Sequence, residues 1–471
     1  MAISVNTNIA SLNTQRNLAN TSLSLQTSLQ RLSSGLRINS ASDDAAGMAI
    51  SNGLTAQVNG MNQAVRNAND GLSLLGTADS AVSQQTDLLQ RMRELAVQSA
   101  SDTNSNDNRT ALNNEASQLK SELDRIANTT QFNGNNLLDG TFQSKALQVG
   151  AFSTANDRIT MSIGSTKAAS LGSAYKVTSG SVTGTALASG DLTLTVGTTT
   201  YTIGASASDG VSTALNTASA LAKANAVNAV TNNTGVTAEA DTTVTAGSAQ
   251  TAGTIADGDL TINGVSLGAV TLAGASDQSL VAAINAKFAQ TGVTASLNAA
   301  NKVVLDAADG RNITTVSANT TFSGWANATA TTEGTMTLRS TGAFTVGGAT
   351  VANAGLTAGA AALATTENIN TMDLTTKTGA QLGIKEIDVA LSQLNTSRAN
   401  FGALTNRLNS TVSNLSSASQ NAASANSRIM DADFASETAN MSRAQVLQQA
   451  GVAILAQANA APQLALKLLQ G

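Results

Sequence analysis

Apolar residues recur every seven positions in two long segments, one toward each end of the chain. The first repeat consists of Leu54, Met61, Ala68, Leu75, Val82, Leu89 and Ala96, and the second of Ile387, Leu394, Phe401, Leu408, Leu415, Ala422 and Ile429. Strict seven-residue spacing keeps one apolar seam of a helix turned toward a partner helix. We therefore expect the two segments to pair as an antiparallel rod, with the middle of the chain inserted at its far end.

Two further amphipathic segments lie outside this rod. Residues 5–36 carry Leu25, Leu29, Leu32 and Leu36 at 4-3-4 spacing, and the last helix carries Ile454 and Leu455 among other apolar residues. Their apolar faces are broad, so pairing them only with each other leaves apolar surface in water. The pattern predicts ends that are disordered in the monomer and become ordered when other copies cover them in a polymer.

Turn signals and strand patterns begin after a third helical stretch. That stretch has Leu112, Ala116, Leu119, Leu123 and Ile126 on one face, and FNGNNLLDGTF (132–142) then brings Asn-Gly and Asp-Gly turns. Alternation through Leu147, Val149, Ile159, Met161 and Ile163 predicts a β-hairpin beside the helices.

The middle of the chain is rich in threonine, alanine, glycine and serine, and it contains an internal repeat. GDLTLTVG (190–197) resembles GDLTINGV (258–265), and NTGVTAEA (233–240) resembles QTGVTASL (290–297). With helical stretches expected at Leu215–Val230 and Leu280–Phe288, the repeat predicts two related β-α-β modules. A less regular β region is expected around Val303–Val351. Convergent low complexity is the alternative explanation of the repeat.

The predicted fold class is mainly α with inserted β-rich domains: a discontinuous N-/C-terminal helical coiled-coil rod plus α+β outer domains. The divisions expected are an N-terminal coil helix and linker at 1–45, an inner rod with its hairpin at 46–175, a variable outer region at 176–370, the second rod helix at 371–429 and a C-terminal coil helix at 430–471. Segment 1–45 is expected to pair with 430–471, and 46–175 with 371–429. The two modules fall near 188–245 and 256–317.

Composition narrows the possible chemistry. The chain has no cysteine and no histidine, which excludes disulfides, the usual zinc, copper and haem ligands, and the commonest general base near neutral pH. Aromatic residues are 2% and charged residues 12%, both low for a globular enzyme. We expect an assembly subunit with no enzymatic activity, no cofactor and no bound metal.

Charge and hydropathy argue against nucleic-acid binding, a secretory signal peptide and a membrane span. Residues 176–370 hold 11 acidic and 6 basic side chains and account for the whole net charge of −5, which suits a solvated outer surface. No basic patch with interleaved aromatic residues indicates nucleic-acid binding. The start of the chain lacks the pattern of a secretory signal peptide, and no apolar run is long enough to span a membrane.

Several paired carboxylates invite a catalytic or metal-binding interpretation. Asp43 and Asp44, Asp257 and Asp259, and Asp431 and Asp433 are more simply helix caps and turn residues. Asp306 and Asp309 beside Gly310 suit a turn better than a calcium site. The many serine and threonine residues of the middle, and the sequons at Asn232 and Asn312, are candidate glycan acceptors, but a soluble, protease-tolerant surface is the simpler explanation of the composition.

Several longer motifs resemble bacterial flagellins. They are MAISVNTNIASLNTQRNL at the start, LSSGLRINSASDDAAGMAIS (32–51), NANDGLSLLGTADSA (67–81), LLQRMRELAVQSAS (88–101), FNGNNLLDG (132–140) and RIMDADFASETANMSRAQVLQQAGVAILAQAN (428–459). DLTINGVSL (259–267) with AAINAKF (282–288) is similar to the "IN" module of flagellins and hook-associated proteins.

This resemblance implies a structural subunit that polymerises into the flagellar filament for swimming motility. It further implies export of the unfolded chain by the flagellar type III system, an extracellular location and partners of four kinds. These partners are other copies of the chain, an export chaperone at the C-terminal helix, the filament cap and hook-junction proteins, and a host Toll-like receptor. The resemblance places receptor recognition on Arg91, Leu95 and Glu115. We also expect Arg91 and Leu95, four positions apart, to share one helix face that is exposed in the monomer. The same face is expected to pack against neighbouring subunits in a filament, and both roles are compatible.

Three alternatives accompany the filament interpretation. A hook–filament junction protein is the nearest of them, and an outer domain that acts as an adhesin is another. The third is the zinc protease that some flagellins carry, but it needs H-E-x-x-H, and the chain has no histidine.

Overall fold

The computed structural model describes residues 7–318, 323–325, 328–364 and 366–470, and for 461–470 the backbone only. The chain forms two compact units, which are described separately. The first contains Met1–Thr77, Phe142–Ser162 and Asn400–Gly471, and the second contains Ala78–Thr141 and Ile163–Ala399. Two long helices, α2 (Ala45–Ala100) and α9 (Lys377–Met430), contribute to both units. Parts of the predicted end segments 1–45 and 430–471 lie outside the described residues.

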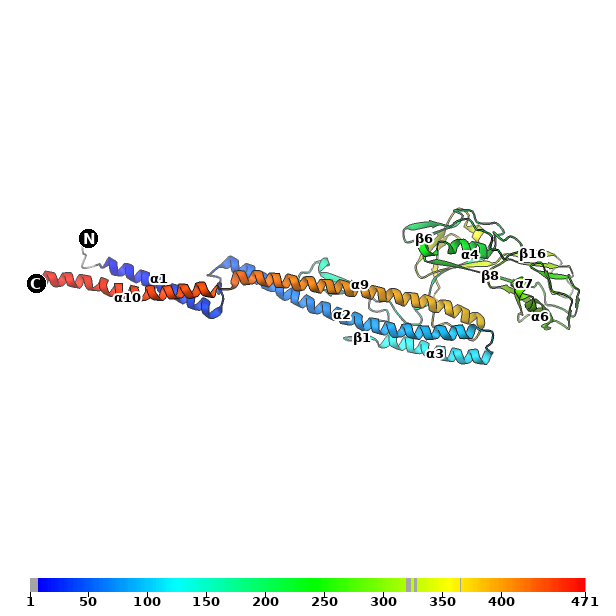
Figure 1. Ribbon diagram of the computed structural model, residues 1–471, viewed down its shortest axis with the longest axis horizontal. Helices are drawn as coiled ribbons and strands as arrows, with labels where there is room; N and C mark the ends of the chain where they lie inside the picture. The colour runs from blue at the N-terminus through cyan, green and yellow to red at the C-terminus, as the bar shows by residue number, and fades with distance from the viewer. Residues whose placement is uncertain (1–6, 319–322, 326–327, 365, 471) are drawn as a thin grey trace. The chain divides into compact units, whose positions relative to one another are not determined.

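In the first unit, α1 (Ile9–Ser34) and α10 (Phe434–Gln470) pack side by side (Figure 1). Asn8 caps α1, because its side-chain oxygen accepts from the Ser11 N–H, and its Nδ2 donates to the Ala458 carbonyl of α10. Gly35 ends α1 in the left-handed conformation, with φ of 72°. The backbone N–H of Arg37 then donates to the Met430 carbonyl at 2.6 Å, so the two chain segments leave the terminal pair together.

Polar contacts and a hairpin join the other elements of this unit. Ser51 of α2 donates to Asn426 of α9 at 2.6 Å, and Ser419 of α9 donates to Asn62 of α2 at 2.9 Å. The predicted hairpin is confirmed: β3 (Lys145–Gln148) pairs antiparallel with β4 (Arg158–Met161). A Cβ at Gly71 would lie 2.5 Å from Cδ2 of Leu147, so glycine lets the hairpin lie directly on α2.

In the second unit, α3 (Asn106–Thr129) follows the polar loop that ends α2. Ser105 caps α3, and the buried Arg109 guanidinium donates to the carbonyls of Ser101 and Asn104 in that loop. After α3 the chain turns sharply at Asn133 and Gly134, with φ of 49° and 77°, and joins β1 (Gln131–Phe132) to β2 (Asn135–Asn136). Positive φ at both turn residues is the requirement of a type I′ two-residue hairpin loop, which Asn-Gly meets.

The inserted region is built of short antiparallel strands and short helices. Its helices are α4 (Ala220–Asn228), α5 (Thr231–Thr234), α6 (Ser279–Ala286) and α7 (Phe288–Thr291). Its strands are β5 (Tyr175–Ser181), β6 (Thr193–Val196), β7 (Thr199–Thr202), β8 (Val236–Thr245), β9 (Gly253–Ile255), β10 (Leu260–Ile262), β11 (Val265–Ser266), β12 (Val270–Leu272), β13 (Thr294–Leu297), β14 (Val303–Ala307), β15 (Ile313–Ser317), β16 (Thr329–Thr332), β17 (Thr335–Ser340), β18 (Phe344–Gly347), β19 (Gly359–Ala360) and β20 (Ala362–Leu363).

A sheet in the order β13-β14-β8-β17-β5-β20 runs through this region. Strand β8 is central to it, because its first part pairs with β17 and its last part pairs with β14. Smaller sheets in the orders β19-β18-β6-β7 and β11-β10-β15-β16 pack nearby. The mainly α fold with an inserted β-rich middle therefore agrees with the class expected from the sequence.

The internal repeat has a structural counterpart. Nδ2 of Asn228 donates to the Ala238 carbonyl while its Oδ1 accepts from the Ala238 N–H, and Asn285 makes the same two bonds with Ala295. The hydroxyls of Thr234 and Thr291 likewise bond the carbonyl four residues before and the N–H two residues after. Asn228 and Asn285, Thr234 and Thr291, and the left-handed Gly235 and Gly292 are each separated by 57 positions. Matching bonds at a constant offset support duplication over convergent low complexity.

The helix expected at Leu215–Val230 begins later than predicted. Leu215 has φ of 52°, which a helix does not allow, and Ser219 caps α4 by accepting from the Ala222 N–H. The helix expected at Leu280–Phe288 is broken between α6 and α7 at Lys287. Apolar spacing alone misplaced the start of α4 because the Ser219 cap decides it, whereas no side-chain cap marks the break at Lys287.

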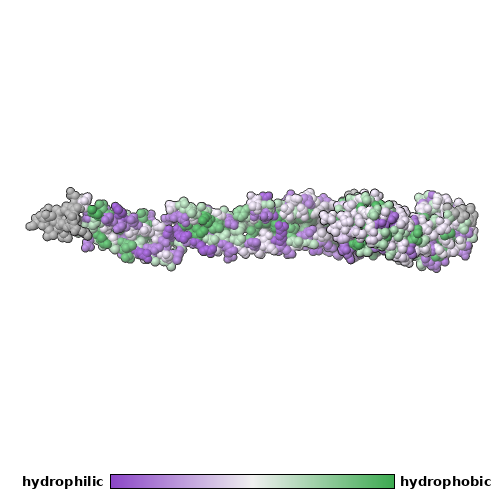
Figure 2. Space-filling view, turned by 90° about the horizontal axis from the view of Figure 1, so that it is seen from above, coloured by the Kyte–Doolittle hydropathy of each residue, from purple (hydrophilic) through white to green (hydrophobic). Residues whose placement is uncertain are grey.

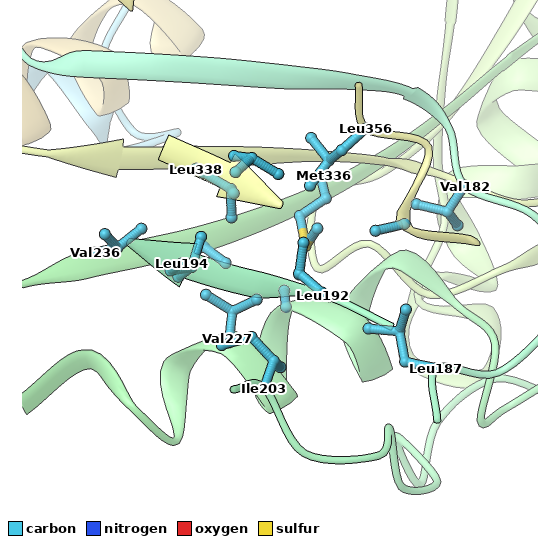
Figure 3. Packing of buried hydrophobic residues seen from close by; sticks show 14 of the residues in the cluster. Val182, Leu187, Leu192, Leu194, Ile203, Val227, Val236, Met336, Leu338 and Leu356 are labelled. Atoms are coloured by element: carbon cyan, nitrogen blue, oxygen red, sulfur yellow. The ribbon is translucent and has the colours of Figure 1, made fainter. Parts of the chain in front are cut away.

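Each module has its own apolar core. In the first, Leu192, Leu194, Val227, Val236 and Leu338 point toward one another from β6, α4, β8 and β17 and their flanking turns (Figure 3). In the second, Leu260, Leu280, Ile284, Val303 and Leu305 form the corresponding cluster.

Asn228→Ala and Asn285→Ala test the equivalence of the modules. Each removes two bonds to a buried strand and leaves backbone groups unpaired, so each should lower the free energy of unfolding of its module by about 1–3 kcal/mol. Hydrogen exchange resolved by module, with the exposed Asn233→Ala as control, measures this. A loss in only one module would contradict equivalence.

Candidate assembly surfaces

The seam residues of the heptad repeats are buried in both units. In the first unit Met61, Leu75, Phe401 and Leu408 have at most 4% of their surface exposed, and in the second Leu89, Ile387 and Leu394 are fully buried. Leu54 and Leu415, nearer the α1–α10 end of the repeats, are half-buried. The seam is therefore an intramolecular core that the chain covers itself.

In the terminal pair, α1 and α10, the apolar residues are not concentrated between the two helices. Among the described side chains, those buried between α1 and α10 are small or polar: Ser11 and Ser28 from α1, and Ala444 and Glu437 from α10. Arg31 lies 3.8 Å from Glu437 across this interface. A charged pair and small side chains bury little apolar area, so this contact alone gives little stability.

Many of the large apolar residues of this pair face outward. Leu29 is 49% exposed and Ile454 is 56% exposed, so neither lies in a core that the described part of the chain forms by itself. Others that are similarly exposed are Ile9, Leu12, Leu23, Phe434, Val446, Leu447 and Val452. Leu25, Leu32 and Leu455 are half-buried. Figure 2 shows such apolar side chains beside polar ones on the surface of the terminal helices. This exposure agrees with the expectation that the pair leaves apolar surface in water.

Arg91 lies at the centre of an exposed charged cluster. It donates to Glu115 of α3 at 2.8 Å and to Glu94 at 2.9 Å, and these hydrogen bonds raise the pKa of Arg91. Leu95 is only 1% exposed, so the expectation that it shares an exposed face with Arg91 is wrong. The reason is that α3 and α9 flank α2 here, as the pairs Arg91–Glu115 and Arg93–Asp388 show, and only a narrow stripe of α2 stays exposed.

The paired carboxylates act as caps and turn anchors. Asp44 accepts from the Gly47 N–H at the start of α2, and Asp433 accepts from Ala435 and Ser436 at the start of α10. Asp309 forms an ion pair with Arg311. Burial, together with the charge of the neighbouring Asp241, raises the pKa of Asp306. Asp257 and Asp259 bond Ser266 and Ala256 in a turn. The described residues contain no group of three acidic side chains arranged for a metal ion.

The two sequons differ in accessibility. Asn312 is fully buried, and its amide donates to the carbonyls of Ala214 and Leu215, so it is not available to a glycan in the folded chain. Asn232 is exposed on α5.

A chain of ion pairs links the inserted sheet to α9. Glu367 accepts from Lys176 of β5 at 2.5 Å and from Arg339 of β17 at 2.7 Å. Glu239 of β8 lies 3.7 Å from Arg339 and accepts from Lys385 of α9 at 2.7 Å. Five alternating charges thus connect three strands, the segment that leads into α9, and α9 itself.

Glu386 lies beside this network and is only 4% exposed, and its Oε2 has no hydrogen-bond partner among the described residues. Burial and the charge of Glu367 raise the pKa of Glu386 to about 7, against the opposing pull of Arg339 and Lys120. No pattern in the sequence indicated this group or the Arg31–Glu437 pair, because both depend on residues far apart along the chain.

Comparison with known proteins fits this arrangement of helices and inserted strands. Profiles of the bacterial flagellin N-terminal and C-terminal helical regions match residues 5–143 and 384–469, and the flagellin hook IN motif matches 259–309. B-type flagellin of Pseudomonas aeruginosa is 41% identical, and flagellin D of Vibrio cholerae is 34% identical, each over the full length of both chains. The chain belongs to the bacterial flagellin family.

Solved structures similar to this flagellin-family chain include two from flagellar proteins. FliC from Burkholderia pseudomallei is 19% identical, with a TM-score of 0.31, and the match covers 72% of this chain and 99% of that one. Flagellar hook associated protein-3 from Legionella pneumophila is 12% identical, with a TM-score of 0.36, and the match covers 80% and 98%. In the described part of the chain, no helix is both long and apolar enough to cross a membrane.

Leu408→Asp tests the seam. It puts a carboxylate into a fully buried position and should destabilise the first unit by about 3–5 kcal/mol. Thermal unfolding followed by circular dichroism measures the loss, with the exposed Asn409→Asp as the matched control. Equal melting of both variants would mean that Leu408 is not in the core.

Glu386→Gln tests the buried carboxylate. Because the pKa is raised from 4.5 to about 7 on folding, the folded state holds the proton more tightly, and stability falls as pH rises through this window. The amide removes that cost, so the variant should be more stable than the parent by about 2–3 kcal/mol above pH 7. The difference should vanish below pH 4.5. A difference independent of pH would contradict the assignment.

Proposed function

We propose that this chain builds the extracellular flagellar filament, and that the outward apolar faces of α1 and α10 are the surfaces through which copies associate. The observation that carries this is the exposure of large apolar residues on both terminal helices, while small and polar residues lie between them. Identity to flagellins across the whole chain favours a filament subunit over the junction alternative.

The energetics favour association over a free terminal pair. Burying one exposed leucine or isoleucine contributes about 1.5–3 kcal/mol, and Leu12, Leu29, Leu447 and Ile454 are each about half exposed or more. Contacts between different patches on neighbouring copies do not close on themselves and so produce a helical polymer. The seam of α2 and α9 is already buried, so assembly leaves it unchanged.

The same exposure suggests how the subunit is handled before assembly. We infer export of the unfolded chain through the flagellar type III system, with a chaperone that covers the apolar residues of α10, such as Val446 and Val452. No disulfide can form in transit, because the chain has no cysteine. The filament cap and the hook-junction proteins are proposed to contact the same terminal helices at the ends of the polymer.

Receptor recognition is proposed on the exposed charged stripe of α2 and α3. Arg91 and Glu115 are accessible there, with side chains 51% and 45% exposed. Leu95 would support this stripe from beneath and would not touch a receptor bound to the folded chain.

Ile454→Asp tests the assembly surface. It places a charge on an outward apolar position that no other described part of the chain covers, so it should abolish or slow seeded polymerisation at least about tenfold while leaving the melting of the α2–α9 seam unchanged. Electron microscopy and light scattering follow the reaction, and the exposed Gln449→Asp on the same helix is the control. Normal filaments from Ile454→Asp would contradict the proposal.

A further inference from the structure

The chain contains four Asn-Gly pairs, and the structure places them in different environments. They are Asn52-Gly53, Asn59-Gly60, Asn133-Gly134 and Asn263-Gly264. Asn-Gly is the dipeptide least hindered sterically against attack of the backbone on its own side chain, because glycine has no Cβ. Whether that attack occurs depends on the freedom of the asparagine amide and of the glycine N–H.

Asn133 and Asn263 form a matched pair. Both are first residues of tight turns with nearly the same backbone, φ of 49° and 52°, and each is followed by a glycine with φ near 77°. Asn263 is 6% exposed, its Nδ2 donates to the Thr291 carbonyl at 2.9 Å, and its Oδ1 accepts from the Thr314 N–H at 2.8 Å. Asn133 is exposed, and its amide has no hydrogen bond to the described residues. The two sites therefore have the same turn geometry and differ in whether the asparagine side chain is held by hydrogen bonds.

The other two pairs are held by a helix. Asn52 and Asn59 are exposed, but both lie within α2, where the N–H of each following glycine donates to the carbonyl four residues earlier. That nitrogen is not free to attack until the helix opens locally. The N–H of Gly134 lies in the turn and makes no hydrogen bond within the described part of the chain.

We propose that Asn133 is a site of spontaneous conversion to aspartate and isoaspartate in the folded protein, and that the other three Asn-Gly pairs are protected. The Gly134 nitrogen loses its proton and attacks Cγ of Asn133. The N–Cγ bond forms, the Cγ–Nδ2 bond breaks, and ammonia leaves with the proton. Water then opens the five-membered imide at either carbonyl and leaves aspartate or isoaspartate at this position, with no oxidant or reductant required.

The conversion alters the turn as well as the charge. Either product adds one negative charge. Isoaspartate also adds a backbone atom to a two-residue turn whose strands pair only through Phe132 with Asn135 and Gln131 with Asn136. The fully buried Leu137 and Leu138 follow the turn after the two residues of β2, so the change acts on a segment anchored in the second unit.

The experiment incubates the full-length protein in oxygen-18 water at mildly alkaline pH, folded and in urea, and follows each site by tryptic peptide mapping. Residues 38–66, 126–145 and 224–287 are separate tryptic peptides, and together they contain all four sites. Oxygen-18 marks only the conversion that occurs during the incubation, and fragment ions place it on one asparagine. Asn133→Gln keeps the amide but disfavours the five-membered ring. Loss of the oxygen-18 label from peptide 126–145 in this variant would therefore assign the label to Asn133.

In the folded protein, Asn133 should convert at least about tenfold faster than Asn52, Asn59 and Asn263, because those three must first open locally. In urea all four sites should convert at similar rates. Folded-state conversion at Asn133 no faster than at Asn263 would overturn the proposal, as would faster conversion at either helical site.

Discussion

The apolar stripe along each long helix has to be buried away from water. The rest of the structure depends on whether the same chain or other copies bury it. For α2 and α9 the chain provides it, since Met61, Leu75, Leu394 and Leu408 are buried against partners within the same unit. For α1 and α10 it does not, and residues such as Leu29 and Ile454 face solvent. The first arrangement gives a stable subunit, and the second gives a subunit whose folding is completed by its neighbours.

The contents of the α1–α10 interface explain why the terminal pair does not cover itself. Ser11, Ser28 and Ala444 let the two helices lie close together, and Arg31 and Glu437 add a charged pair between them. Polar groups at a helix interface fix register better than they add stability. A pair that is aligned but weakly held keeps its leucines available to other copies.

The sequence predicted the features that repeat locally. The heptad seams, the β3–β4 hairpin, the capping roles of Asp44 and Asp433 and the β-rich inserted middle all follow from spacing and turn chemistry, and the structure has them. The error at Leu95 has a tertiary cause. Whether Leu95 is buried depends on which helices flank α2, and periodicity along one helix does not contain that information. Glu386 and the ion-pair chain from Lys176 to Lys385 were missed for the same reason.

The inserted region is organised by repeated hydrogen bonds and ion pairs, unlike the apolar stripes of the long helices. In each of its two modules an asparagine, Asn228 or Asn285, makes the same pair of hydrogen bonds to a strand, and the modules share one sheet through β8 and β14. A chain of ion pairs connects that sheet to α9. The terminal helices and the outer region are thus stabilised by different interactions, so a change in one need not disturb the other.

Hydrogen exchange of α1 and α10 amides, in the separate subunit and in the polymer, tests the central claim most directly. If these helices are completed only by other copies, their amides should exchange rapidly in the subunit and slowly in the polymer. The amides of α2 should be protected in both states. Equal, strong protection of α1 and α10 in the separate subunit would contradict the account.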